Sequence, residues 1–137
     1  MENDYLCIIK FYGMKINFIK AKDFERNIKC TVHKSGKLGF TESSIKKLNI
    51  EKNRYIKLGT NEEEKNSDDL YMTLQESDDE FCFKAVKAGR YYYINTKALF
   101  DMLNVDYKKN TVIYDIIEIN DEGMLIYKLK RREKERK

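Results

Sequence analysis

One short run in the sequence has residue types suited to base stacking, Arg90 followed by Tyr91, Tyr92 and Tyr93. Aromatic rings beside a guanidinium can stack on the bases of a single nucleic-acid strand. Successive side chains of a strand point to opposite faces, so we expect Tyr92 on one face and Tyr91 and Tyr93 on the other. At least one of these faces should pack in the core. The run is therefore interpreted first as structural and second as a base-stacking surface.

Basic side chains at predicted turns and near the C-terminal end form a second feature that could bind nucleic acid. Lysine and arginine neutralise phosphates, and such contacts give salt-sensitive binding that is mostly independent of base sequence. The predicted phosphate contacts come from Lys34, Lys37, Arg54, Arg90, Lys108, Lys109, Lys130, Arg131 and Arg132.

Patterns typical of catalysis or metal binding are weak. The single histidine, His33, follows Cys30 by three residues on a predicted strand, and this spacing places the two on opposite faces. The three cysteines are interpreted as buried free thiols, and the six glycines form no phosphate-binding loop. The acidic residues of 62–80 lack the ligand spacing of a calcium loop. We therefore expect no enzymatic activity, no catalytic residues, no metal site and no cofactor.

Charge is distributed unevenly along the 137 residues, although the net charge is only +4. Residues 128–137 contain seven basic and two acidic side chains, whereas residues 62–80 contain nine acidic side chains and one lysine. Such polarity can steer a charged partner, although charged loops and tails also keep a protein soluble. No segment reaches the roughly 18 apolar residues that a membrane span needs. We expect a cytoplasmic protein without a membrane partner.

Two short helices position these residues. One follows Thr41 and the other follows Thr96, and each threonine is predicted to cap the first turn with its side-chain oxygen. Apolar residues recur at three- and four-residue spacing within each segment. Asn49 and Asn104 then supply the left-handed conformation that commonly ends a helix.

The segments around the helices read as strands, so each half of the chain follows the plan strand, strand, helix, strand, strand. Five compatible residue pairs at a constant separation of 55 residues connect the halves, 28–75 and 81–127. Either a duplication or chance convergence of two short helices could explain them. We predict an α+β fold of mostly antiparallel strands in a single compact domain over 1–127, with an N-terminal strand extension at 1–27 and a basic tail at 128–137.

The run 41–58, TESSIKKLNIEKNRYIKL, resembles the core of the AbrB and MazE swapped-hairpin family. Leu48-Asn49-Ile50 stands where that family has its helix stop, and Leu103-Asn104-Val105 offers a second instance. The chain departs from the family in having no proline before the helix and no Gly-Asp pair in the following turn. Swapped-hairpin units form a core only in pairs, so the resemblance implies two tandem divergent copies that make a pseudo-dimer.

Two functions remain open from the sequence. The first is a non-enzymatic DNA-binding protein, such as a transcriptional regulator, that contacts phosphates through the basic turns and tail. The alternative is a protein-interaction or structural module, in which the acidic loop or a strand edge docks an unidentified protein partner. In either case the chain would be a monomer with pseudo-dimeric architecture or a homodimer.

Overall fold

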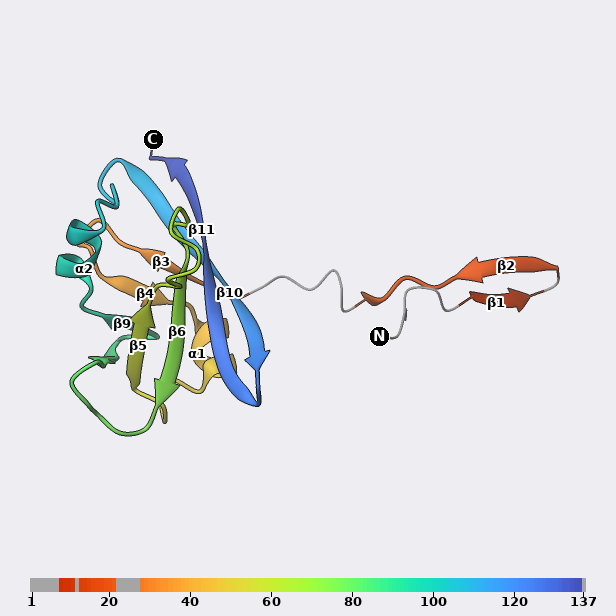
Figure 1. Ribbon diagram of the computed structural model, residues 1–137, viewed down its shortest axis with the longest axis horizontal. Coiled ribbons are helices and arrows are strands. Elements are labelled where there is room, and N and C mark those ends of the chain that lie inside the picture. Colours follow the sequence, from red (N-terminus) through yellow and green to blue (C-terminus); the bar gives the residue numbers. More distant parts are fainter. Residues whose placement is uncertain (1–7, 12, 22–27, 137) are drawn as a thin grey trace.

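The computed structural model describes residues 8–11, 13–21 and 28–136 (Figure 1). The predicted N-terminal extension, 1–27, is thus described only in part, and Cys7 lies outside the described residues. Within it, β1 (Ile8–Phe11) and β2 (Met14–Asn17) pair antiparallel in a two-stranded sheet of their own.

The remaining strands form one antiparallel sheet, and two short helices accompany it, as the predicted α+β class requires. The elements are β3 (Ile28–Val32), β4 (Leu38–Phe40), α1 (Glu42–Leu48), β5 (Tyr55–Gly59), β6 (Leu70–Gln75), β7 (Phe83–Lys84), β8 (Val86–Ala88), β9 (Tyr91–Ile94), α2 (Lys97–Met102), β10 (Asn110–Asp121) and β11 (Met124–Glu135). Neither helix is long and apolar enough to cross a membrane, and no other α-helix occurs among the described residues.

The sheet curls into a nearly closed barrel. Its strand order is β7-β5-β6-β11-β10-β3-β4-β9-β8, so the two outermost strands, β7 and β8, are consecutive in the chain. β7 pairs with β5 and β8 pairs with β9, and between them the Ala85 N–H donates to the Arg54 carbonyl at 2.7 Å. Because the segment 83–88 bridges the two ends of the order, β5 and β9 each have a neighbouring strand on both sides.

Apolar side chains of alternate strand positions fill the barrel. Val112, Tyr114 and Ile116 of β10 are buried in succession, and the ring of Phe100 from α2 stacks on Tyr114 with centroids 6.2 Å apart. α1 follows β4 and α2 follows β9, and these two strands are antiparallel neighbours. The helices therefore begin at opposite ends of the sheet, as Figure 1 shows.

Both predicted helix stops are confirmed. Asn49 and Asn104 have φ values of 50° and 58°, in the left-handed region. The residue after each asparagine closes the helix with the same bond, Ile50 N–H to the Ile45 carbonyl at 3.1 Å and Val105 N–H to the Phe100 carbonyl at 2.9 Å. Ile50 is fully buried, so each stop returns an apolar side chain to the core.

The two predicted helix caps have different outcomes. Thr41 caps α1 as predicted, because its Oγ1 accepts from the Ser44 N–H at 3.4 Å. Thr96 makes no cap hydrogen bond to α2, and that prediction was wrong. Its buried hydroxyl instead donates to the Gly36 carbonyl at 2.9 Å, because the turn between β3 and β4 packs against the start of α2.

The C-terminal basic run is largely a strand and not a tail. Residues 128–135 belong to β11, which pairs with β10 along its whole length, from Asp121 opposite Met124 to Asn110 opposite Glu135. Tyr127 and Leu129 alternate with the basic residues and are buried in the core. The high charge of the run concealed this alternation.

We expect Asn49→Ala to lower the free energy of unfolding by about 1 to 2 kcal/mol, because a side chain with a Cβ is strained in the left-handed region. Asn49→Gly is the matched control and should cost less, because glycine adopts this conformation freely. Urea unfolding followed by circular dichroism measures both. Equal losses for the two variants would contradict a conformational cause.

Candidate nucleic-acid interface

The predicted phosphate contacts fall at three places on the barrel. β3 ends and β10 begins at the same end, since Val32 pairs with Val112. This end carries Lys34 and Lys37 in the β3–β4 turn and Lys108 and Lys109 before β10. Arg54, before β5, and Arg90, between β8 and β9, lie at the opposite end, and the remaining three residues lie on β11: Lys130, Arg131 and Arg132.

Arg136, which the sequence analysis did not include, holds the first of these ends together. Its Nε donates to the Tyr107 carbonyl at 3.1 Å and its Nη2 to the Val32 carbonyl at 3.3 Å. Its backbone N–H donates to the Lys109 carbonyl at 2.8 Å. These bonds bring the end of β11 against the end of β3 and the loop before β10. A shallow hollow of about 380 Å³ results, lined by Lys34, Thr111, Lys134, Glu135 and Arg136.

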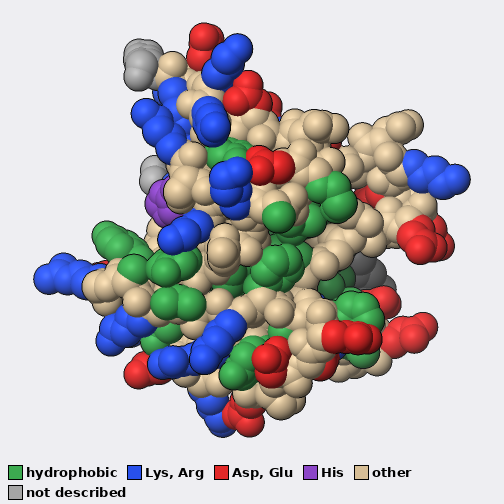
Figure 2. Space-filling view, turned by 90° about the vertical axis from the view of Figure 1, so that its left-hand side faces the viewer, with side chains coloured by type: hydrophobic (Ala, Val, Ile, Leu, Met, Phe, Trp, Pro, Cys, Tyr) green, Lys and Arg blue, Asp and Glu red, His purple; other side chains and the backbone are tan. Residues whose placement is uncertain are grey.

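We define the basic end as Lys34, Lys37, Lys108, Lys109 and Lys134. Within the part of the chain that the structure describes, none of these five lysines makes an ion pair. Figure 2 shows Lys and Arg side chains grouped beside the histidine, which is purple, on the upper left of this face. The sequence analysis did not include Lys134 among the predicted phosphate contacts, because it treated the charged run 128–137 as a tail.

Two of the predicted contacts, Arg131 and Arg132, already have carboxylate partners. Arg132 forms a two-pronged pair with Asp115, at 2.7 Å from Nε to Oδ2 and 3.0 Å from Nη2 to Oδ1. The Arg131 side chain is only 15% exposed and pairs with Glu133 and, at 3.6 Å, with Asp68. Their charges are therefore matched within the chain.

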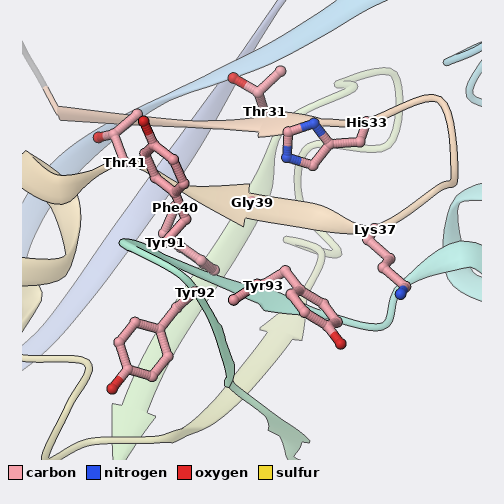
Figure 3. A pocket seen from close by; sticks show the side chains of 10 residues that line it. Thr31, His33, Lys37, Gly39, Phe40, Thr41, Tyr91, Tyr92 and Tyr93 are labelled. Carbon is pink, nitrogen blue, oxygen red and sulfur yellow. The ribbon is translucent and has the colours of Figure 1, made fainter.

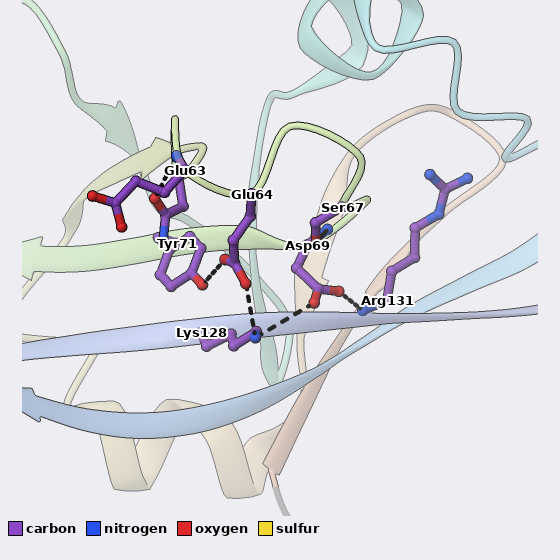
Figure 4. Close-up of polar contacts among 8 residues, drawn as sticks. Glu63, Glu64, Ser67, Asp69, Tyr71, Lys128 and Arg131 are labelled. Atoms are coloured by element: carbon purple, nitrogen blue, oxygen red, sulfur yellow. Dashed lines mark hydrogen bonds and ion pairs between the residues drawn. The ribbon is translucent and has the colours of Figure 1, made fainter.

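The acidic loop between β5 and β6 lies against β11 (Figure 4). Lys128 Nζ is 3.7 Å from both Glu64 Oε2 and Asp69 Oδ2, and Glu64 is the main cause of the raised pKa of Lys128. Asp69 Oδ1 accepts a hydrogen bond from the Arg131 backbone N–H at 3.0 Å. The Tyr71 hydroxyl donates a hydrogen bond to Glu64 Oε1. Part of the acidic middle of the sequence thus neutralises part of the basic C-terminal run.

The two arginines at the opposite end also have partners. Arg54 Nε donates to the Glu51 carbonyl at 3.2 Å, and its guanidinium lies 5.7 Å from the centroid of the Tyr92 ring. Arg90 is 4.0 Å from Glu42, and both side chains are well exposed, so that pair is weak.

The tyrosine run alternates as predicted. Tyr92 is buried, Tyr91 is 55% exposed, and Tyr93 is half-buried. The outward side chains border a hollow of about 400 Å³, which we call the aromatic groove and define by its main lining residues, His33, Lys37, Gly39, Tyr91 and Tyr93 (Figure 3).

Gly39 determines the shape of the aromatic groove. It pairs with Tyr93 across β4 and β9, and it has no side chain to fill the space beside that ring. A Cβ at Gly39 would overlap His33 Nε2, so the imidazole ring lies directly on this glycine. Lys37 Nζ is 4.4 Å from the centroid of the Tyr93 ring. No sequence pattern joined these residues, because the two tyrosines lie more than 50 positions from the other three.

Cys30 and His33 lie on opposite faces of the sheet, as their spacing predicts. Cys30 is fully buried inside the barrel, where burial raises the pKa of its thiol, whereas His33 is exposed on the outside. The Asp79 carboxylate is paired with Lys57 at 2.9 Å, and the hydrogen bond from Lys57 is the main reason that the pKa of Asp79 is lowered. Over the described ranges, no three His, Cys, Asp or Glu side chains are grouped so that they could hold a metal ion.

Comparison of the chain with protein families, with curated proteins and with solved structures finds no match.

We expect Asp69→Ala to lower the free energy of unfolding by roughly 1 to 3 kcal/mol, because it leaves the Arg131 N–H without its acceptor. Asp69→Asn keeps an acceptor oxygen and removes only the charge, so its loss should be smaller and should shrink as salt is added. Urea unfolding at low and high ionic strength tests this. Indistinguishable losses for the two variants would show that the hydrogen bond contributes little.

Proposed function

We propose that this chain is a non-enzymatic nucleic-acid-binding protein that contacts the phosphates of DNA through its basic end. The proposal rests on one observation, that five lysines without an ion pair among the described residues converge on one end from three separate segments. The segments are the β3–β4 turn, the loop before β10 and the C-terminal end of β11. Phosphates are the ligands for which clustered, solvated lysines are best suited.

The contrast with the rest of the surface supports this choice. Arg131, Arg132 and Lys128 all have carboxylate partners within 4 Å, so they offer little uncompensated charge. The net charge of the chain is only +4, but the five lysines of the basic end have no carboxylate partner among the described residues. A regulator of transcription remains the role that we favour for such a protein.

We further infer that the two halves, 28–75 and 81–127, are divergent copies of one unit. The strand order supports this inference. The strands of the first half can be matched with those of the second: β3 with β7 and β8, β4 with β9, β5 with β10, and β6 with β11. When each strand is replaced by its match, the order around the barrel is the same, read in the opposite direction. Hairpins of one half alternate with hairpins of the other, as the resemblance to the AbrB and MazE swapped-hairpin family implies.

The pairing register supports it as well. Ile28 pairs with Ile116 between β3 and β10, and 55 positions after Ile28, Phe83 pairs with Ile56 between β7 and β5. Ile56 and Ile116 are both buried and are the strand partners of Phe83 and Ile28, although they are 60 positions apart. Met72 pairs with Tyr127, again 55 positions later, where the two halves meet between β6 and β11.

A protein-interaction role is the second candidate, and one observation favours it. The hairpin of β10 and β11 extends beyond its neighbours, since β3 pairs only with residues 112–116 and β6 only with residues 127–129. Met124 and Leu125 at its tip are 62% and 48% exposed. An apolar interface there would be insensitive to salt, in contrast to phosphate contacts.

We expect Lys108→Gln with Lys109→Gln to weaken binding to duplex DNA at low salt and to reduce the slope of log affinity against log salt concentration by about 2. Lys46→Gln with Lys47→Gln in α1 removes the same charge at the opposite end and is the control. Fluorescence anisotropy of labelled random duplex across a salt series measures both. An equal reduction by the control would contradict binding at the basic end, and no binding by the native protein would favour the protein-interaction role.

We expect fragments 1–78 and 79–137 to be unfolded when separate and to fold when mixed in equal amounts. Four strand pairings join the halves, β3 with β10, β4 with β9, β5 with β7 and β6 with β11, so a single half can form only isolated hairpins. Circular dichroism and size-exclusion chromatography report the outcome. A fragment that folded alone as a monomer would contradict the interleaved arrangement.

A further inference from the structure

We propose that the aromatic groove takes an unpaired base of single-stranded DNA while the basic end holds the neighbouring phosphates. This inference rests on the proposed nucleic-acid-binding function and specifies the form of nucleic acid that the site prefers.

The first support is the arrangement of rings. Tyr91 and Tyr93 project from the same face of β9, and the His33 ring, just after the end of β3, lies over Gly39 (Figure 3). A hollow of about 400 Å³ lies among these rings, within the range of sites that bind small molecules. Bases of any sequence stack on aromatic side chains, because every base has a π face.

The second support is the placement of positive charge. Lys37 belongs both to the groove and to the basic end, since its Nζ lies over the Tyr93 ring at 4.4 Å. Lys34 is in the same turn, three residues earlier. A strand whose base enters the groove would therefore meet lysines at the adjacent phosphate. In Figure 2, hydrophobic side chains lie below the basic side chains that surround the histidine.

The third support is the polar lining. Thr31 and Thr41 flank the groove, and the His33 imidazole faces it. Hydroxyl and imidazole groups can form hydrogen bonds with the edge of a base, and this edge is free only in an unpaired base. A base in a duplex is stacked on both faces, so it could not enter the groove without being extruded.

The test uses the absence of tryptophan from the chain. In Tyr93→Trp the single indole reports on the groove and still offers a stacking surface. We expect oligo(dT) to quench its fluorescence on binding, whereas an oligomer of equal length and charge with abasic sites should quench it little. Phe81→Trp is the matched control, because Phe81 is 67% exposed and lines a different hollow with Tyr71 and Ile126 of β6 and β11. Oligo(dT) should not quench that indole.

Affinity provides a second measurement. Tyr93→Leu keeps an apolar strand residue without a stacking ring, and its thermal unfolding shows whether the fold persists. We expect it to bind oligo(dT) between about five-fold and about a hundred-fold more weakly than the native protein. Binding to the abasic oligomer and to duplex should change less than two-fold, because the lysines remain.

The outcomes separate this inference from the proposed function. Equal affinity of the native protein for oligo(dT) and the abasic oligomer would overturn the base site and leave phosphate binding intact. Quenching of the Tyr93→Trp variant by thymidine monophosphate as tightly as by oligo(dT) would also overturn it, because the groove would then be a mononucleotide site. No binding to any nucleic acid would overturn both proposals.

Discussion

The closure of the sheet through residues 83–88 is the constraint on which the rest of the structure depends. This segment pairs with β5 on one side and with β9 on the other, and the Ala85 N–H reaches the Arg54 carbonyl where the two pairings change over. Ala85 is fully buried, because the barrel interior lies behind it. Without this bridge β5 and β9 would each have an open edge, and fewer strand pairings would hold the sheet in this one order.

Closure also determines which charges meet. Once β6 pairs with β11, the loop that precedes β6 must run beside the basic residues of β11, and Glu64, Asp68 and Asp69 become their partners. The most basic run of the sequence is thereby partly neutralised, whereas the described lysines of the β3–β4 turn, the loop before β10 and the end of β11 have no carboxylate partner. Local charge density in the sequence was therefore a poor guide to the charge that the surface presents.

The aromatic groove arises from cross-strand neighbours and not from any single segment. Tyr93 stands opposite Gly39, and the space that a larger residue would occupy is shared between the His33 ring and the hollow. The tyrosine run was recognisable from its residue types, and the alternation of a strand correctly divided it between core and surface. Its companions could be identified only after β4 and β9 were known to be adjacent.

The sequence by itself determined the local elements: both helix stops, the Thr41 cap, the strands around the helices and the inward and outward faces of the tyrosine run. These depend on interactions among residues close in the chain, and so on the conformational preferences of a few side chains. Only the tertiary structure decided the strand order, the partner of the Thr96 hydroxyl and the place of residues 128–135 in β11. Those features depend on contacts between distant segments, such as Thr96 with Gly36 or Arg131 with Asp69, whose mutual positions exist only once the barrel has closed.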